Sequence, residues 1–408
     1  MKLLLIHQAF QLESGAGGTR HFEFGKHFVS QSDENQFVVV ASNLNYMDAK
    51  RTPESDRRKT VDGVECVRAT IPRFIHKGYF WRVVAYVAYM TSSAMVALRE
   101  KNVDVVMGTS PSLFQASSAA MVAWIRRKPF LLEVRDLWPD FAIDMGVLKS
   151  RVLIKIARWV ESFIYWRADR FLVNSPAYVD YLVDRGIAPE LITLIPNGVD
   201  PNMFSASDEA QSAGKSFRQE MKIENNFVVT YAGAIGQAND IPTIVRAAER
   251  LADDGSIKFL IVGGGKSEAQ VRQLIETKGL KNIIMPGSRP KNEMSGVLAG
   301  SDVCVATLLN IKMFRTVYPN KIFDYMAAGK PIALGIDGVI REVVEAADGG
   351  KFFEPGNDEQ LAETLLWMKN NQDESLKMGQ RGREYVVEHF NRHTHSAEFL
   401  TLIQSLQN

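Results

Sequence analysis

The sequence predicts an α/β protein of two doubly wound domains that face each other across a cleft, and three observations support this. Short runs rich in Val, Ile and Leu alternate with longer helical patterns along almost the whole chain, which is typical of parallel sheets covered by helices on both faces. A length of 408 residues predicts two or three domains. The alternation is interrupted by a polar stretch over residues 200–215, and such a shift in composition marks a domain boundary.

The first half is expected to form one domain over residues 1–199. Its strands are predicted at 2–7, 36–42, 103–107, 129–134, 170–174 and 192–195. Its helices are predicted at 19–30, 81–101, 114–126, 151–166 and 177–185.

The second half repeats the same alternation after residue 200. Strands are predicted at 227–231, 258–262, 283–285, 303–306 and 331–334. Helices are predicted at 241–253, 268–278, 292–299, 321–328 and 339–346, and from 358 to the end. Because doubly wound folds bind ligands at the carboxyl ends of their strands, we expect the chemistry in the cleft.

Charge and cysteine content exclude several classes of protein. Forty-eight basic and 47 acidic residues leave a net charge of +1, which argues against a nucleic-acid-binding protein. Cys66 and Cys304 lie far apart in apolar runs, which excludes a disulfide framework and a thiolate zinc site. No apolar run is long enough to span a bilayer, so we expect a cytoplasmic protein.

In each predicted domain, a glycine-rich loop follows the first strand. Gly17 and Gly18 lie in the first loop, and Gly233 and Gly236 lie in the second. Glycines there let backbone N–H groups approach a phosphate at a helix N-terminus, although a simple tight turn is the alternative. A third group, over 263–265, is equally consistent with a nucleotide-facing loop and a bare strand-to-helix turn.

Arg135 and Asp136 end a buried strand. Charged groups are costly to bury unless they are paired or used, and strand ends are where ligands meet them. Arg135 is therefore a candidate for a phosphate or a sugar hydroxyl, and Asp136 for accepting hydrogen bonds from a sugar. The alternative is that the two side chains only pair with each other.

The stretch over 312–331 is the richest in candidate site residues. Asn320 or Pro319 would open a short helix with Lys321 in its first turn and Asp324 one turn later. A helix N-terminus with a lysine suits a pyrophosphate, and a carboxylate nearby suits a ribose diol. A solvated helix face is the alternative reading of the same spacing.

Histidine spacing and basic–aromatic stretches complete the sequence evidence. No set of histidines with acidic or cysteine neighbours forms a metal site, and no nucleophile elbow is present. Aromatic residues are mixed with basic ones from Arg73 to Arg82 and from Lys149 to Arg167, which suits an anionic membrane surface. Core packing with a solvated face is the alternative.

Nearly the whole chain resembles the family 4 retaining glycosyltransferases of GT-B fold, in the bacterial fucosaminyltransferase-like branch that builds surface polysaccharide. The resemblance rests on residues 17–20 (GGTR), 43–46 (NLNY), 135–139 (RDLWP), 195–200 (IPNGVD) and 319–331 (PNKIFDYMAAGKP). It implies an acceptor-side Rossmann-like domain over 1–199 and a nucleotide-sugar domain over 200–385. It also implies a C-terminal helix over 386–408 that crosses back, and no metal or cofactor.

The chain departs from that family at several positions. Ala234 and Asn239 stand near the places of the family's phosphate-binding Arg and Lys, so Arg289, Lys321 and helix N-termini are our candidates for that role. The family's paired glutamates fall on Thr316 and Asp324, and a common family histidine is replaced by Arg135. The residues predicted to bind the donor are Gly17, Gly18, Gly233, Gly236, Arg289, Thr316, Asn320, Lys321 and Asp324; those predicted to act in catalysis are Arg135 and Asp136.

The resemblance implies sugar transfer from a nucleoside diphosphate sugar, expected to carry UDP and a hexose or N-acetylated amino sugar. The expected acceptor is a lipid-linked saccharide at the inner face of the plasma membrane, in polysaccharide or O-antigen synthesis. Two alternatives remain open: a non-hydrolysing nucleotide-sugar epimerase, and a catalytically silent scaffold subunit that binds nucleotide sugar.

Overall fold

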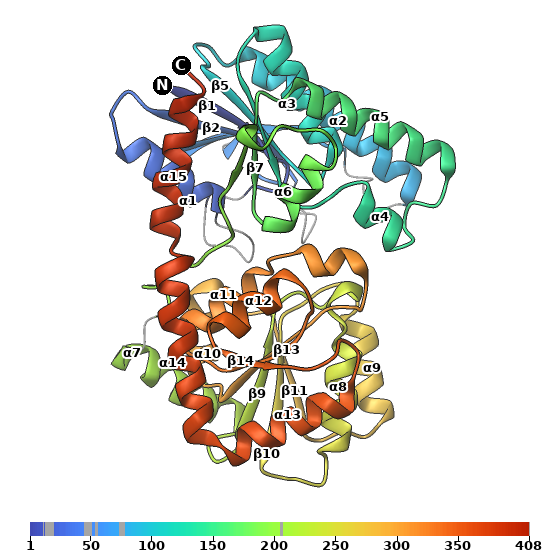
Figure 1. The fold of residues 1–408 in the computed structure, drawn as a ribbon, viewed down its shortest axis with the longest axis vertical. Helices are drawn as coiled ribbons and strands as arrows, with labels where there is room; N and C mark the ends of the chain where they lie inside the picture. The colour runs from blue at the N-terminus through green and yellow to red at the C-terminus, as the bar shows by residue number, and fades with distance from the viewer. Residues whose placement is uncertain are drawn as a thin grey trace. The chain divides into compact units, whose positions relative to one another are not determined.

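The fold is that of a computed structural model, which describes residues 1–10, 12, 20–44, 51–53, 56–72, 78–204 and 207–407 (Figure 1). The chain divides into two compact units, Met1–Pro196 with His393–Asn408, and Asn197–Arg392. Each unit is a sheet of mainly parallel strands covered by helices on both faces, as the sequence predicts.

The N-terminal unit is built on an eight-stranded sheet of order β3-β4-β2-β1-β5-β6-β7-β8. All its neighbours pair in parallel except β3 with β4. The strands are β1 (Lys2–Ile6), β2 (Gln36–Ser42), β3 (Arg58–Val61), β4 (Val64–Ala69), β5 (Val105–Thr109), β6 (Phe130–Val134), β7 (Arg170–Val173) and β8 (Ile192–Leu194).

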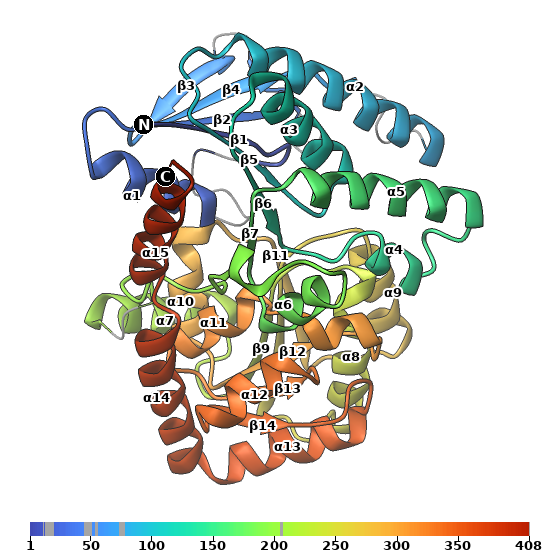
Figure 2. The same cartoon turned by 45° about the horizontal axis from the view of Figure 1, so that its top comes forward.

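The helices of this unit pack on the two faces of that sheet. They are α1 (Arg20–Ser30), α2 (Tyr79–Arg99), α3 (Leu113–Arg126), α4 (Asp140–Asp144), α5 (Arg151–Arg167), α6 (Pro176–Val183) and α15 (Arg392–Ser405). Helix α3 packs between α2 and α5 on one face, and α1 and α15 lie together on the other (Figure 2). The rings of Phe24 and Phe399 stack at 4.5 Å, which joins α15 to the core around Leu3 and Leu5.

The C-terminal unit has a six-stranded, wholly parallel sheet of order β11-β10-β9-β12-β13-β14. The strands are β9 (Phe227–Ala232), β10 (Ile257–Val262), β11 (Ile283–Gly287), β12 (Val303–Thr307), β13 (Ile332–Gly335) and β14 (Gly350–Phe352). The helices are α7 (Asp208–Met221), α8 (Ile241–Arg250), α9 (Glu268–Thr277), α10 (Met294–Ala299), α11 (Asn320–Ala327), α12 (Val339–Ala346), α13 (Asp358–Asn370) and α14 (Gln372–His389).

The polar stretch predicted as a linker contains most of a helix, α7. Ser207 caps its N-terminus by accepting a hydrogen bond from the backbone N–H of Ala210 (3.3 Å). Only Gly214 and Phe217 are buried along it, so the helix lacks the apolar period that the sequence argument requires. A Cβ at position 214 would lie 2.8 Å from the backbone nitrogen of Gly300, so the glycine lets α7 and α10 pack closely.

Candidate functional site

Two glycine loops of the C-terminal unit lie against each other at the carboxyl ends of β9 and β10. The backbone N–H of Gly233 donates to the carbonyl of Val262 (2.9 Å), and that of Ile235 donates to Gly264 (2.9 Å). Gly263 has φ +142°, and a Cβ there would lie 1.8 Å from the carbonyl oxygen of Gly233. The third glycine group therefore has a packing role, because no larger residue permits this approach.

Lys321 extends from the first turn of α11 to the loop after β9. Its Nζ donates to the hydroxyl of Tyr231 (3.0 Å) and to Oδ1 of Asn239 (2.7 Å), and it lies 4.5 Å from the centroid of the Tyr231 ring. No carboxylate of the described residues forms an ion pair with it. Burial lowers the pKa of Lys321 to about 7, because the surrounding groups are neutral.

The partners of Lys321 are themselves fixed. The Tyr231 hydroxyl donates to the carbonyl of Ala234 (2.7 Å), and the Thr307 hydroxyl donates to the carbonyl of Asn239 (2.6 Å). A Cβ added at Gly233 would lie 3.6 Å from Cε of Lys321. The structure thus brings together the predicted Gly233 and Lys321 in one preorganised group.

The other residues predicted to bind the donor have different surroundings. Asn320 is exposed as the first residue of α11, and Gly236 caps a short turn of 3-10 helix beside Asn239. Arg289 forms ion pairs with Glu220 (2.5 Å) and Glu293 (3.3 Å), so its charge is already balanced.

Thr316 and Asp324 are the residues that the resemblance places at the family's two glutamates. The Thr316 hydroxyl donates to the carbonyl of Met313 (2.7 Å), within a turn of 3-10 helix over Lys312–Thr316. Asp324 is partly buried one turn after Lys321 on α11. Gly17 and Gly18 lie outside the described residues.

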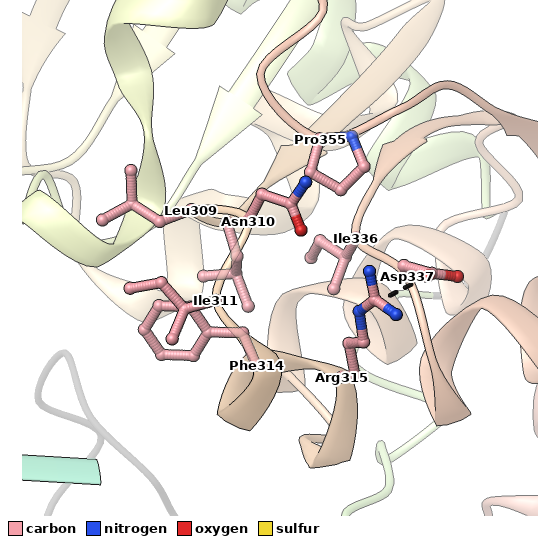
Figure 3. Close-up of a pocket in the computed structure, with 9 residues that line it drawn as sticks. Leu309, Asn310, Ile311, Phe314, Arg315, Ile336, Asp337 and Pro355 are labelled. Atoms are coloured by element: carbon pink, nitrogen blue, oxygen red, sulfur yellow. Dashed lines mark ion pairs between the residues drawn. The ribbon is translucent and has the colours of Figure 1, made fainter. Parts of the chain in front are cut away.

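A small pocket opens beside the turn that holds Asn239, at the ends of β12 and β13 (Figure 3). The backbone N–H of Leu309 donates to the carbonyl of Ala238 (3.0 Å), which places the pocket next to the Asn239 turn. Arg315 and Asp337 point toward each other at one side of it, with Nε and Oδ2 3.5 Å apart. The lining residues are Leu308, Leu309, Asn310, Ile311, Phe314, Arg315, Ile336, Asp337 and Pro355.

A second polar group lies at the carboxyl ends of β1, β5 and β6 in the N-terminal unit. Glu133 is fully buried, with Oε1 2.9 Å from Nε of Arg20 and Oε2 2.5 Å from Nε2 of His21. The Thr109 hydroxyl also donates to Oε2 (2.8 Å). Burial raises the pKa of Glu133, but His21 and Arg20 outweigh burial and hold it well below its usual value.

Arg135 and Asp136 follow Glu133 and are positioned through their backbone. Their N–H groups donate to the Ser110 hydroxyl oxygen, at 2.7 and 3.0 Å. Burial raises the pKa of Asp136 to about 6, although Arg135 opposes this. The two side chains form no ion pair among the described residues, so mutual pairing does not account for them.

Several of these contacts were missed by sequence reasoning. Arg20, His21 and Glu133 were not singled out, nor were Tyr231 and its bond to Lys321. The signal for Glu133 was present, because a carboxylate inside an apolar strand requires a partner. The identity of its partners was not readable, since Arg20 lies 113 residues away.

No group of three or more His, Cys, Asp or Glu side chains in the described ranges could hold a metal ion. Within the same ranges, no helix is long and apolar enough to cross a membrane.

The structure has two sheets with polar groups at the carboxyl ends of their strands. Comparison with family models assigns each half of the chain to a glycosyltransferase family. The chain matches the model of glycosyl transferases group 1 over residues 213–385 and that of the glycosyl transferase 4-like domain over residues 32–198. The chain belongs to the family 4 glycosyltransferases of GT-B fold.

Curated relatives are similar in sequence, and solved structures are similar in fold. WcaI of Escherichia coli K12, named for a glycosyl transferase role in colanic acid biosynthesis, is 23% identical over 265 residues, 64% of this chain and 62% of WcaI. The alpha-galactosylglucosyldiacylglycerol synthase of Streptococcus pneumoniae is 26% identical over 60% of this chain and 64% of the synthase. These matches span less than two thirds of either relative. The structure of Anabaena HepE with UDP-glucose superposes with TM-score 0.75 at 17% identity, over 99% of this chain and 100% of HepE.

Proposed function

We propose that the chain transfers a sugar from a UDP-sugar to a hydroxyl of a lipid-linked saccharide, with retention at the anomeric carbon and without a required metal ion. The observation that carries this is Lys321, a cation held at a glycine loop by oxygens that are all neutral among the described residues. HepE binds UDP-glucose on the same fold, and the pneumococcal relative is a glycolipid synthase. The bound sugar is expected to be a hexose or an N-acetylated amino sugar.

In the transfer, the bond between the anomeric carbon and the diphosphate oxygen breaks, and its electron pair goes to the diphosphate. The acceptor hydroxyl oxygen bonds to the same face of the anomeric carbon, and its proton goes to the leaving phosphate oxygen. Protonated Lys321 stabilises the charge that develops on the diphosphate. The carboxylate of Asp136 accepts hydrogen bonds from sugar hydroxyls in the N-terminal unit.

The charge at Lys321 is suited to this role because no carboxylate in the described part of the chain neutralises it. In contrast, Arg289 is engaged by two carboxylates and contributes less free charge to a ligand. An epimerase would need acid and base groups around the donor, but the side chains that bind Lys321 are a phenol and an amide. We therefore favour transfer over epimerisation.

The test is to incubate the purified chain with a panel of UDP-sugars and a lipid extract, and to analyse products by mass spectrometry and NMR. Transfer predicts a sugar on lipid with the anomeric configuration of the donor. Isomerised donor without acceptor would establish an epimerase instead, and donor binding without any product would establish a silent scaffold.

We also propose that helices α2, α3 and α5 contact an anionic membrane surface. Their 52 residues include seven basic residues and one acidic residue, Glu161, which is 3% exposed and paired with Arg158 at 3.0 Å. Their large exposed side chains include Trp124, Trp159 and Trp166, at 60%, 71% and 72% exposure. An apolar, basic and acid-free surface suits the interface of an anionic bilayer. The part of the predicted surface from Arg73 to Lys77 lies outside the described residues.

Vesicle flotation tests this contact. The double variant W159Q/W166Q should bind phosphatidylglycerol-containing vesicles roughly tenfold less than the original chain, because it loses two interfacial anchors. L376Q, which changes a 60% exposed leucine of the C-terminal unit, is the matched control. Equal flotation of all three proteins would rule out this surface.

A further inference from the structure

The carboxyl edge of the N-terminal sheet contains buried polar groups that its own residues leave unsatisfied. Nδ1 of His7 and Nε of Arg135 are buried, and among the described residues neither has a hydrogen-bond partner. Asp136 stands next to Arg135 with no ion pair in the same part of the chain, and burial raises the pKa of its carboxyl to about 6. Unsatisfied buried polar atoms are rare in native structures, so a ligand is a natural partner for these.

The hydrogen bonds around Glu133 explain why Nδ1 of His7 and Nε of Arg135 have no partner among the described residues. Both oxygens of Glu133 are occupied, one by Arg20 and the other by His21 and Thr109. Each nitrogen of the Arg20 guanidinium also donates a hydrogen bond. Nε donates to Glu133, and the terminal nitrogens donate to the carbonyls of Pro196 (2.6 Å) and Ile195 (2.7 Å). Glu133 and Arg20 therefore balance each other, and the charge of Arg135 is surplus to that balance.

The unsatisfied groups are held rigidly at the cluster. The ring centroids of His7 and His21 are 4.7 Å apart, and His21 bonds to Glu133. The pKa of His7 is lowered well below its usual value, first by burial and then by the charges of His21 and Arg135. His7 is thus neutral. The backbone N–H of Arg135 is fixed by its hydrogen bond to the Ser110 hydroxyl oxygen.

The chemistry of this set selects a ligand class. A guanidinium binds carboxylate or phosphate oxygens as a planar fork, and an imidazole adds a neutral polar contact. The Asp136 carboxylate accepts hydrogen bonds from hydroxyl groups but repels an anion, so a bare anion does not satisfy the whole set. A molecule with both hydroxyls and one anionic group satisfies it.

We propose that this edge is a subsite for an acidic sugar. Arg135 binds the carboxylate or phosphate of that sugar, and Asp136 accepts a hydrogen bond from one of its hydroxyl groups. The inference rests on the proposed function and adds to it that the reaction has an acidic sugar as one of its substrates. Arg135 is then a residue that determines specificity for charge.

Binding to the full chain, measured by calorimetry and ligand-observed NMR, tests this. The probes are methyl glucuronide for the carboxylate, glucose 6-phosphate for the phosphate and methyl glucoside as the neutral sugar. At least one acidic probe should bind roughly tenfold tighter than the neutral one, the gain of a charge-assisted contact. The preferred acidic probe identifies the anionic group.

Variants locate the effect and separate it from folding. R135Q should bind acidic and neutral probes equally, R135K should show an intermediate preference, and K101Q, at an exposed lysine of the same unit, should behave as the original chain. Thermal melting of each variant reports whether it is folded. Equal binding of acidic and neutral probes by the original chain, or an unchanged preference in folded R135Q and R135K, would overturn the subsite. UDP binding is measured in parallel, because its loss would contradict the proposed function, whereas its presence without acidic-sugar preference contradicts only this inference.

Discussion

A buried carboxylate in the N-terminal unit and an enclosed ammonium in the C-terminal unit occupy the same kind of position, at the carboxyl edge of a parallel sheet. Glu133 is surrounded by two basic side chains and a hydroxyl, whereas the described partners of Lys321 are a phenol and an amide oxygen. Burial disfavours both charges, but only Glu133 has countercharges that reverse the effect.

The difference separates a charge used for structure from one available to a ligand. Removing a buried ion that is fully compensated is strongly destabilising, because it leaves its partners buried and unpaired. A buried cation without a counterion costs stability until an anion arrives. The predictions below test this contrast in order of decreasing effect.

The largest effect is expected at Glu133. Replacing it with glutamine leaves the buried Arg20 without its countercharge, which should lower the free energy of unfolding by roughly 3–5 kcal/mol. Urea denaturation measures this. Asp62→Asn is the control, because it breaks an exposed pair with Lys26 and should cost less than about 1 kcal/mol. Equal losses in both variants would show that Glu133 is no more structural than a surface carboxylate.

The sign of the effect should reverse at Lys321, with a characteristic pH dependence. Its pKa is about 7 in the folded chain against 10.5 when unfolded, so the unfolded state binds more protons between these values. The cost of burying Lys321 is therefore absent above pH 10.5, grows by roughly 1.4 kcal/mol per unit as pH falls, and is complete below about pH 7.

Lys321→Met removes that cost together with two hydrogen bonds. The variant should consequently gain stability relative to the original chain on going from pH 9.5 to pH 6.5, as measured by urea denaturation at both values. Lys281→Met, at an exposed lysine of the same unit, should show no such trend. A stability difference independent of pH would mean that Lys321 is fully charged and compensated in the fold.

The same contrast shows what the sequence could and could not predict. The two sheets follow from runs of apolar residues, but the β3–β4 hairpin was missed, although Asp62 and Gly63 have positive φ and form its turn. Strand β14, which has three residues and begins four positions after the end of α12, was also missed. Short elements have too few residues to show a period.

The candidate site was predictable by residue type but not by partner. Gly233, Arg135 and Asp136 were predicted because they follow strands, where ligands bind, and Lys321 because it lies in the first turn of a helix. Their contacts depend on tertiary structure, since Lys321 meets Tyr231 across 90 residues of chain. Whether a charge is compensated is therefore decided by the fold and not by local spacing.

Donor affinity should fall by a smaller amount when Lys321 is removed. Lys321→Met should raise the dissociation constant of UDP roughly 10- to 150-fold, because one charge-assisted contact is worth about 1.5–3 kcal/mol. Calorimetry at pH 6.5, where the lysine is mostly protonated, measures this directly. With Lys281→Met as the reference, unchanged UDP affinity in Lys321→Met would place the diphosphate elsewhere and leave the enclosed ammonium without a ligand.

The smallest effect concerns Asp136, which lies between the two extremes because Arg135 only partly opposes its burial. Its raised pKa of about 6 means that the carboxylate form is lost as pH falls through 6. This is the form that accepts hydrogen bonds from hydroxyl groups. Turnover should then fall about tenfold per unit below pH 6, and Asp136→Asn should be less active but lack this inflection. Asp144→Asn, at an exposed carboxylate nearby on α4, should keep the original profile. An inflection that persists in Asp136→Asn would assign the titration to another group.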